Sequence, residues 1–121
     1  MPNTYTQRTL NLLRDQGFKV GVVERWIPGA NIRKDLFGII DIIAISSNKI
    51  IGIQSTSYKQ RKPHLDTIYG SCLDSTKSWL DGGGELWLIS WKKIPVKPGS
   101  KRFKYESVID VIELEKEVTA V

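Results

Sequence analysis

Two apolar stretches in the middle of the chain carry its clearest hydrophobic pattern. They flank residues 46–49 (Ser-Ser-Asn-Lys), whose composition is typical of a hairpin turn. Both stretches are rich in isoleucine. Polar groups stand at their outer ends, with Asp41 near the start of the first and a Gln-Ser-Thr triplet at 54–56 closing the second. The pattern predicts adjacent strands over 39–45 and 49–57, in a buried sheet with a site at its rim.

The same reading predicts elements on either side of this pair. Residues 4–16 have apolar positions at helical spacing, and Thr4 with Gln7 matches a capping box. Alternating residues over 18–23 predict a strand. The other expectations are a loop over 27–37, a helix from Pro63 to about Leu80, a strand over 85–91, a loop over 92–104 and a short edge strand over 103–108. Residues 109–121 are compatible with strand, helix or disorder.

The order of these elements, α-β-β-β-α-β with a further strand, indicates an α/β protein. A three-strand meander followed by a crossover helix and a parallel strand gives a mixed central sheet flanked by helices. The sequence has no internal repeat and no linker, so we expect a single domain over 1–121.

Composition narrows the functional classes. The chain has 18 Lys and Arg against 13 acids, a net charge of +5, which favours a polyanionic partner. One cysteine and one histidine exclude an internal disulfide and a Cys/His zinc site, so any metal needs oxygen ligands. The lone cysteine fits a reducing compartment, and no apolar run has the length of a membrane span or a signal-peptide core. We therefore expect a cytoplasmic protein.

The strand pair brings candidate metal ligands together. Antiparallel neighbours place side chains roughly 4.5–5.5 Å apart, so Asp41 and Gln54 are expected to lie close enough to share one cation. Mg²⁺, or Mn²⁺, prefers oxygen ligands and keeps several waters. The expected protein ligands are the Asp41 carboxylate, the Gln54 side-chain oxygen and the main-chain carbonyl of Ser55. Glu24, at the end of the neighbouring strand, adds a carboxylate directly or through water.

The spacing Asp41-(12 residues)-Gln54-Ser55-Thr56, on a meander after an N-terminal helix, resembles the PD-(D/E)XK nuclease core, also called the restriction-endonuclease-like fold. The similarity is greatest to the small phage and archaeal Holliday-junction-resolvase type. The leader over 33–40 is similar to the segment before the metal aspartate in phage-encoded members. The resemblance covers roughly residues 4–91.

Carried over by this resemblance, Asp41 matches the metal aspartate. Gln54 stands where the family usually has Glu or Asp, and Thr56 where it usually has Lys. An extra acidic position near the N-terminus corresponds to Glu24 or Gln7. We favour Glu24, because Gln7 has a capping role.

Both departures change the chemistry. A neutral Gln54 removes one negative charge from the metal site and should weaken Mg²⁺ binding. Thr56 can position a water but cannot supply the cation that stabilises charge on the phosphate. The candidates to supply that cation instead are Lys34, Arg33 and Lys59. If none does, the chain is a DNA-binding module that has lost cleavage.

The resemblance implies a Mg²⁺-dependent endodeoxyribonuclease, encoded by a phage and acting in its bacterial host. It also implies a symmetric homodimer that cuts branched or junction DNA. The residues expected to hold phosphates are basic: Arg33, Lys59, Arg61, Lys62, Lys92 and Lys93. The alternatives are a catalytically inactive nucleic-acid-binding module of the same fold and a structural or protein-interaction domain.

Individual residues also have purely structural interpretations. Asp41 could end a strand or pair with Arg33. Glu24 could form a salt bridge with Arg25 or Lys34. The single histidine, His64, is expected at the surface rather than as a general base.

Overall fold

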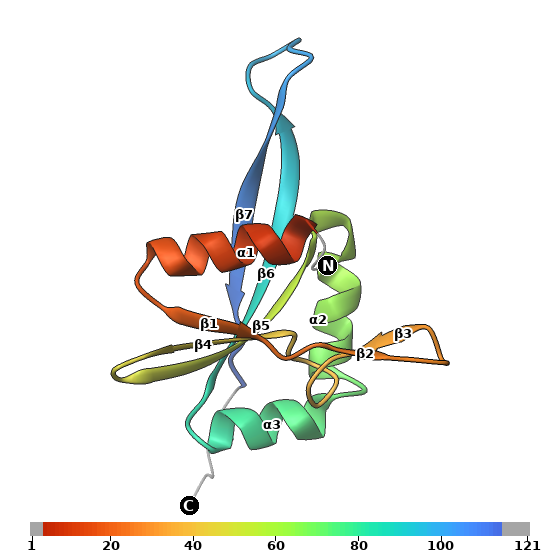
Figure 1. Ribbon diagram of the computed structural model, residues 1–121, viewed down its shortest axis with the longest axis vertical. Helices are drawn as coiled ribbons and strands as arrows, with labels where there is room; N and C mark the ends of the chain where they lie inside the picture. Colours follow the sequence, from red (N-terminus) through yellow and green to blue (C-terminus); the bar gives the residue numbers. More distant parts are fainter. Residues whose placement is uncertain (1–3, 115–121) are drawn as a thin grey trace, which may run out of the picture.

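The computed structural model describes residues 4–114, which form a five-stranded sheet with helices on both faces and a separate two-stranded hairpin (Figure 1). The main sheet has the order β1-β4-β5-β6-β7, and β2 pairs with β3. In chain order the elements are α1 (Thr4–Asp15), β1 (Lys19–Val22), β2 (Arg25–Ile27), β3 (Ile32–Lys34), β4 (Ile42–Ser46), β5 (Lys49–Ser57), a 3₁₀ turn (Tyr58–Gln60), α2 (Arg61–Tyr69), α3 (Leu73–Asp81), β6 (Glu85–Pro95) and β7 (Phe103–Val111). Within residues 4–114, no helix has the length and apolar character needed to cross a membrane.

The predicted α/β class and mixed sheet are confirmed. β1, β4 and β5 form an antiparallel meander, and β5 runs parallel to β6 after the crossover through α2 and α3. β7 then returns antiparallel to β6 along their whole length. The strand predicted over 49–57 is also confirmed, and in it Ile51 and Ile53 pack on one face of the sheet while Gly52 faces Trp79 on the other.

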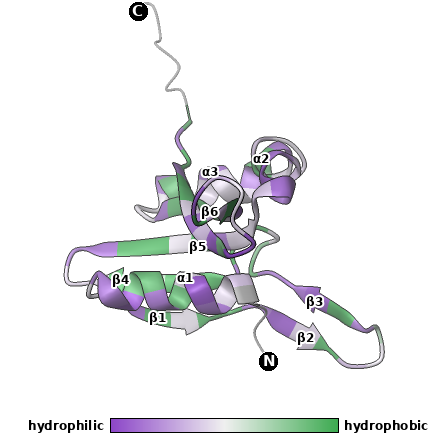
Figure 2. Cartoon of the chain, turned by 90° about the horizontal axis from the view of Figure 1, so that it is seen from above, coloured by the Kyte–Doolittle hydropathy of each residue, from purple (hydrophilic) through white to green (hydrophobic). Residues whose placement is uncertain are grey.

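Each face of the sheet has its own apolar core. On one face, Leu10 and Leu13 of α1 cover buried isoleucines of the meander. On the other, Ile68 of α2 and partly buried residues of α3 pack against Leu86 and Leu88 of β6. Figure 2 shows the sheet between α1 on one side and α2 and α3 on the other.

The single helix predicted over 63–80 is wrong, because the chain forms two helices separated at residues 70–72. Gly70 leaves the helical region with φ −117° and ψ −99°. A Cβ there would lie 2.5 Å from the Asp66 carbonyl oxygen, so the bend requires glycine. The first helix begins at Arg61, and Pro63 lies in its first turn, where an N–H has no intrahelical partner.

Two predicted loops contain strands. Within 27–37, Ile32–Lys34 pairs with Arg25–Ile27 as a hairpin. Within 92–104, β6 continues to Pro95 and β7 begins at Phe103, leaving only a short turn. Lysines and prolines suggested loops there, but solvent-exposed ribbons tolerate such residues because few of their side chains need burial. β6 and β7 consequently extend past α1 as a two-stranded arm, defined here as residues 92–104 (Figure 1).

The C-terminal segment, for which three conformations were left open, continues β7 as far as Val111. Residues 115–121 lie outside the described part of the chain, as do residues 1–3.

Candidate metal centre

Three carboxylates converge at the rim of the sheet. One oxygen from each of Glu24, Asp35 and Asp41 lies within 4.8 Å of the other two. Asp41 is buried, with 6% of its surface exposed, and the other two are partly buried. Like charges at this separation repel, so the arrangement is costly unless protons or a cation neutralise it.

The backbone explains why residues so far apart in sequence meet here. The N–H groups of Val23 and Glu24 both donate to the Asp41 carbonyl oxygen, at 2.9 and 3.3 Å, which joins the end of β1 to the start of β4. The β2–β3 hairpin pairs Arg25 with Lys34, so Glu24 and Asp35 are the residues at its base.

A second tight turn completes the cluster. Leu36 and Ile40 form an isolated antiparallel bridge, with the Leu36 N–H donating to the Ile40 carbonyl oxygen at 2.7 Å. Asp35 and Asp41 flank this bridge. The cluster therefore sits at the shared base of two reversals of the chain, and its geometry is set by backbone pairing.

Asp41 is held by the neighbouring strand. The Ser55 backbone N–H donates to both of its carboxylate oxygens, each at 3.2 Å. Burial raises the pKa of Asp41 to about 8, despite the opposing effect of the Ser55 hydrogen bond, and the charges of Asp35 and Glu24 raise it further. Burial also raises the pKa of Glu24, with Asp35 adding to the rise and Arg33 opposing it.

Gln54 joins the cluster through Asp35 rather than through Asp41. Its side-chain Nε2 donates to Asp35 Oδ2 at 3.0 Å. The residue is only 3% exposed, and its Oε1 is buried without a hydrogen-bond partner. An unpaired buried carbonyl oxygen lowers the stability of the fold. The Gln54 amide that carries it contacts Asp35, one of the three acids.

The donor set fits a hard divalent cation. Three carboxylates and an unsatisfied amide oxygen are all oxygen donors, which Mg²⁺ and Mn²⁺ prefer. A cation among the three carboxylates would offset their mutual repulsion. The clustered acids therefore have the chemistry of a site for such a cation.

Two side chains beside the cluster bear on its charge. Arg33 Nη1 lies 3.9 Å from Glu24 Oε1, so the salt bridge expected at Glu24 is formed with Arg33. His64 of α2 is partly buried rather than at the open surface. Burial lowers its pKa, and the charge of Asp35 partly opposes this effect.

The structure brings together part of the predicted set. Glu24 and Asp41 belong to the cluster, and Gln54 contacts it. Asp35 was missed. It lies in the leader before Asp41, and the turn-forming Phe-Gly pair at 37–38 was the available signal that the chain reverses between the two acids.

The other predicted catalytic and metal positions have these surroundings. The Ser55 hydroxyl lies 2.7 Å from the Thr9 hydroxyl of α1, and a ligand role for its carbonyl stays a prediction. Thr56 is buried near the end of β5. Lys34 is exposed on β3 and makes no ion pair with the cluster acids among residues 4–114.

The predicted phosphate-binding residues divide into two groups. Arg61 forms a bidentate ion pair with Asp110 of β7: its Nε donates to Oδ2 at 2.8 Å and its Nη2 to Oδ1 at 2.7 Å. Its charge is therefore already used to attach α2 to the sheet. Lys92 lies over the Tyr58 ring and Lys93 over the Phe103 ring, and both remain exposed, as do Lys59 and Lys62.

Comparisons with models of known protein families, with curated proteins and with solved structures found no match to this chain.

Proposed function

We propose that this protein is a metal-dependent phosphodiester hydrolase acting on DNA. The observation that carries the proposal is the convergence of Glu24, Asp35 and Asp41, with the buried Gln54 amide bonded to Asp35. Such a site suits a cation that binds phosphate, and the exposed basic arm suits a polyanionic substrate.

The order of elements supports the restriction-endonuclease-like assignment. A helix, an antiparallel meander, a helical crossover and a parallel strand occur in the succession that the PD-(D/E)XK resemblance implies. The acids lie at the start of β4 and opposite the end of β5, where that resemblance expects the metal.

Glu24, Asp35, Asp41 and the Gln54 oxygen would hold the cation, Mg²⁺ or Mn²⁺. When bound, such an ion polarises the scissile phosphate and lowers the pKa of a coordinated water. The Ser55 N–H fixes the orientation of Asp41. We assign the role of the missing lysine to Arg33, whose guanidinium pairs with Glu24 while 41% of its side chain stays exposed. A phosphate at the cluster would therefore meet a cation supplied by the chain, which stabilises charge on its oxygens.

The arm supplies affinity for the DNA backbone. It carries Lys92, Lys93, Lys97, Lys101, Arg102 and Lys104. A two-stranded ribbon fits the width of a DNA groove, and its cations would contact phosphates without reading sequence. Branched or junction DNA as substrate and a homodimer as the active form complete the proposal.

The test is cleavage of branched, nicked and linear DNA by purified protein in Mg²⁺, Mn²⁺ or EDTA. We expect nicking with either ion and none in EDTA. Asp35→Asn and Asp41→Asn should each reduce the rate at least 100-fold, since each removes a carboxylate from the site. Asp15→Asn, an exposed acid in the last turn of α1, is the matched control and should cleave like the wild type. Retained cleavage in both cluster variants would overturn the proposal.

Thr56 in place of a lysine favours one second candidate, a nucleic-acid-binding module that does not cleave. This module would bind DNA at low salt with unchanged affinity in Asp41→Asn, and wild-type protein would leave every DNA intact in both metal ions. Absence of DNA binding at low salt would instead favour a structural or protein-interaction domain.

A further inference from the structure

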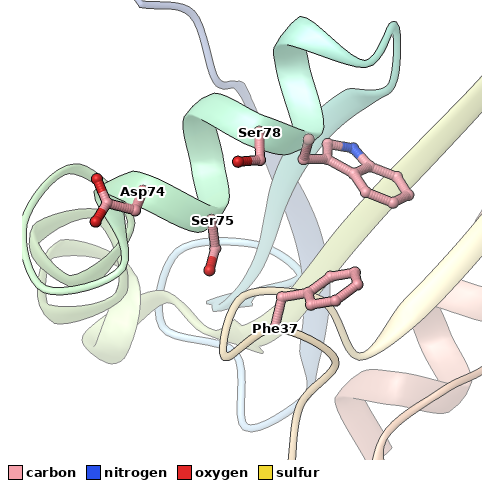
Figure 3. A pocket seen from close by; sticks show the side chains of 5 residues that line it. Phe37, Asp74, Ser75 and Ser78 are labelled. Carbon is pink, nitrogen blue, oxygen red and sulfur yellow. The ribbon is translucent and has the colours of Figure 1, made fainter.

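A pocket of about 550 Å³ opens between the 36–40 turn and α3. Phe37 faces α3 across it, and Asp74, Ser75 and Ser78 line the helical side (Figure 3). Trp79 completes the lining. The volume is within the range of pockets that hold a small organic ligand, about 300–1,000 Å³. Two aromatic rings and several polar atoms give it the chemistry of a site for a flat heterocycle.

Phe37 adopts an unfavourable backbone conformation without gaining burial. Its φ is +57°, in the left-handed region that bulky residues rarely occupy, and 60% of its surface is exposed. The other such non-glycine residue within 4–114 is Asn31, a residue type that tolerates this region. Strain that positions an exposed aromatic ring is typical of a binding site.

The opposite wall is rigid. The Trp79 indole Nε1 donates to the Glu85 carbonyl oxygen at 2.6 Å, and the ring lies against Gly52 and Gly84, where an added Cβ would collide with it. One aromatic wall is therefore fixed by the core, and the other is presented on a turn. A planar ligand entering between them would find a preformed surface.

The pocket and the acid cluster share one structural element. Phe37 lies two residues after Asp35 and four before Asp41, within the turn closed by the Leu36–Ile40 bridge. Two residues of fully extended chain span at most about 7 Å, so the Cα atom of Phe37 is within that distance of the Asp35 Cα. A group bound in the pocket and a phosphate at the cluster can thus belong to the same nucleotide or to adjacent ones.

We propose that the pocket receives one unstacked nucleobase of the DNA, next to the phosphate held at the acid cluster. This inference rests on the proposed function. The Phe37 ring stacks on the base, and the Ser75 and Ser78 hydroxyls contact its polar edge. An enzyme that selects an extruded base favours DNA in which a base is already unpaired, because the cost of unstacking is then lowest.

The test is DNA binding in EDTA, so that it does not depend on metal or cleavage. Fluorescence anisotropy compares a paired duplex with the same duplex carrying one bulged cytosine or one bulged thymine. We expect wild type to prefer the cytosine bulge over the paired duplex by about tenfold, the scale of one base–aromatic stack. Phe37→Ala should abolish this preference.

Phe103→Ala is the matched control, a phenylalanine of the arm with 51% of its surface exposed. It should change affinity for paired and bulged DNA equally. Equal binding of all three duplexes by wild type, or an unchanged preference in Phe37→Ala, would overturn the nucleobase assignment. Neither result depends on cleavage, so the proposed hydrolase activity stands or fails separately in the metal experiment.

Discussion

At the scale of single residues, Asp41 bears the largest electrostatic cost in the described chain. A buried carboxylate close to two other acids is unfavourable as an anion, and the Ser55 N–H compensates only in part. Because of this cost, we expect the stability of the metal-free protein to depend on pH differently from that of most small domains. Those domains become less stable in acid, because their paired carboxylates are protonated.

We predict that the metal-free protein becomes less stable as pH rises towards 8. The pKa of Asp41 is about 8 in the folded chain against 3.8 as its ordinary value, so the folded state binds more protons between these values. The contribution of Asp41 is therefore fully present below about pH 4 and is lost as pH rises through 8, and Glu24 acts in the same direction. Thermal denaturation in EDTA at several pH values between 5 and 8.5 measures this effect.

The Asp41→Asn variant is the control for that experiment. An amide keeps the acceptor for the Ser55 N–H but does not titrate, so its melting temperature should vary less with pH. Millimolar Mg²⁺ or Mn²⁺ should raise the melting temperature of wild type at pH 8 and leave that of Asp41→Asn unchanged. A wild-type curve that rises with pH in EDTA would contradict the account of this carboxylate.

Phe37 is a second residue with an unfavourable feature, because its backbone has a positive φ although its side chain is largely exposed. We predict that Phe37→Asn increases the free energy of unfolding by about 0.5–1 kcal/mol, because asparagine tolerates the left-handed region and little buried surface is lost. Urea denaturation of wild type and variant at pH 6 measures this difference in the free energy of unfolding. A clear loss of stability would show that the ring contributes to packing instead of being held out for a ligand.

At the scale of elements, the site depends on how tightly the 36–40 turn and α3 pack on β5. Gly52 lies beneath Ile40 and Trp79, and an added Cβ would come within 2.5 Å of Ile40 Cδ1 and 3.1 Å of the Trp79 ring. Ile40 directly precedes Asp41 in the chain. Packing at this glycine thus bears on the position of a candidate metal ligand.

We predict that Gly52→Ala destabilises the protein by about 1–3 kcal/mol, the usual cost of overpacking a core. Displacement of Ile40 should also weaken metal binding, seen as a smaller Mn²⁺-induced rise in melting temperature at pH 8. Gly21→Ala is the matched control, a strand glycine of β1 with no atom within 4 Å of the added Cβ. Equal behaviour of the two variants would contradict this account of the packing.

At the scale of the whole molecule, charge is unevenly distributed. The arm concentrates six basic residues, while acids gather at the rim of the sheet near the base of the β2–β3 hairpin. Under the proposed function, such separation would attract a polyanion to the arm and leave the acidic cluster to a cation that bridges protein and phosphate.

We predict that the arm governs the salt dependence of DNA binding. Lys101→Gln with Arg102→Gln should lower the slope of log K against log salt by roughly 1.8, about 0.9 for each phosphate that the protein no longer neutralises. The control is the double variant Arg14→Gln with Lys19→Gln, which removes two exposed basic residues of α1 and β1. It removes the same charge outside the arm and should leave the slope nearly unchanged. Equal slopes in the two double variants would exclude the arm as the surface that binds DNA.

Sequence reasoning was accurate where local pattern and burial agree. The Ile-rich strands and the apolar face of α1 each reach a core, so their periodicity is visible in the residues themselves. The reasoning failed at the helix break near Gly70 and at the arm. In the arm, pairing between exposed backbones creates strands that side-chain pattern does not mark.

The amino-acid sequence by itself determined the α/β class and the meander, because hydrophobic alternation specifies which residues face a core. It also indicated two of the three clustered acids, Glu24 and Asp41, at the polar ends of those strands. Only the tertiary structure decided that Asp35 joins them, that Gln54 contacts Asp35 and that Phe37 faces a pocket on α3. These contacts depend on the register of a short hairpin and a tight turn. In this exposed hairpin no buried face specifies the register, so the hydrophobic pattern of the sequence does not reveal it.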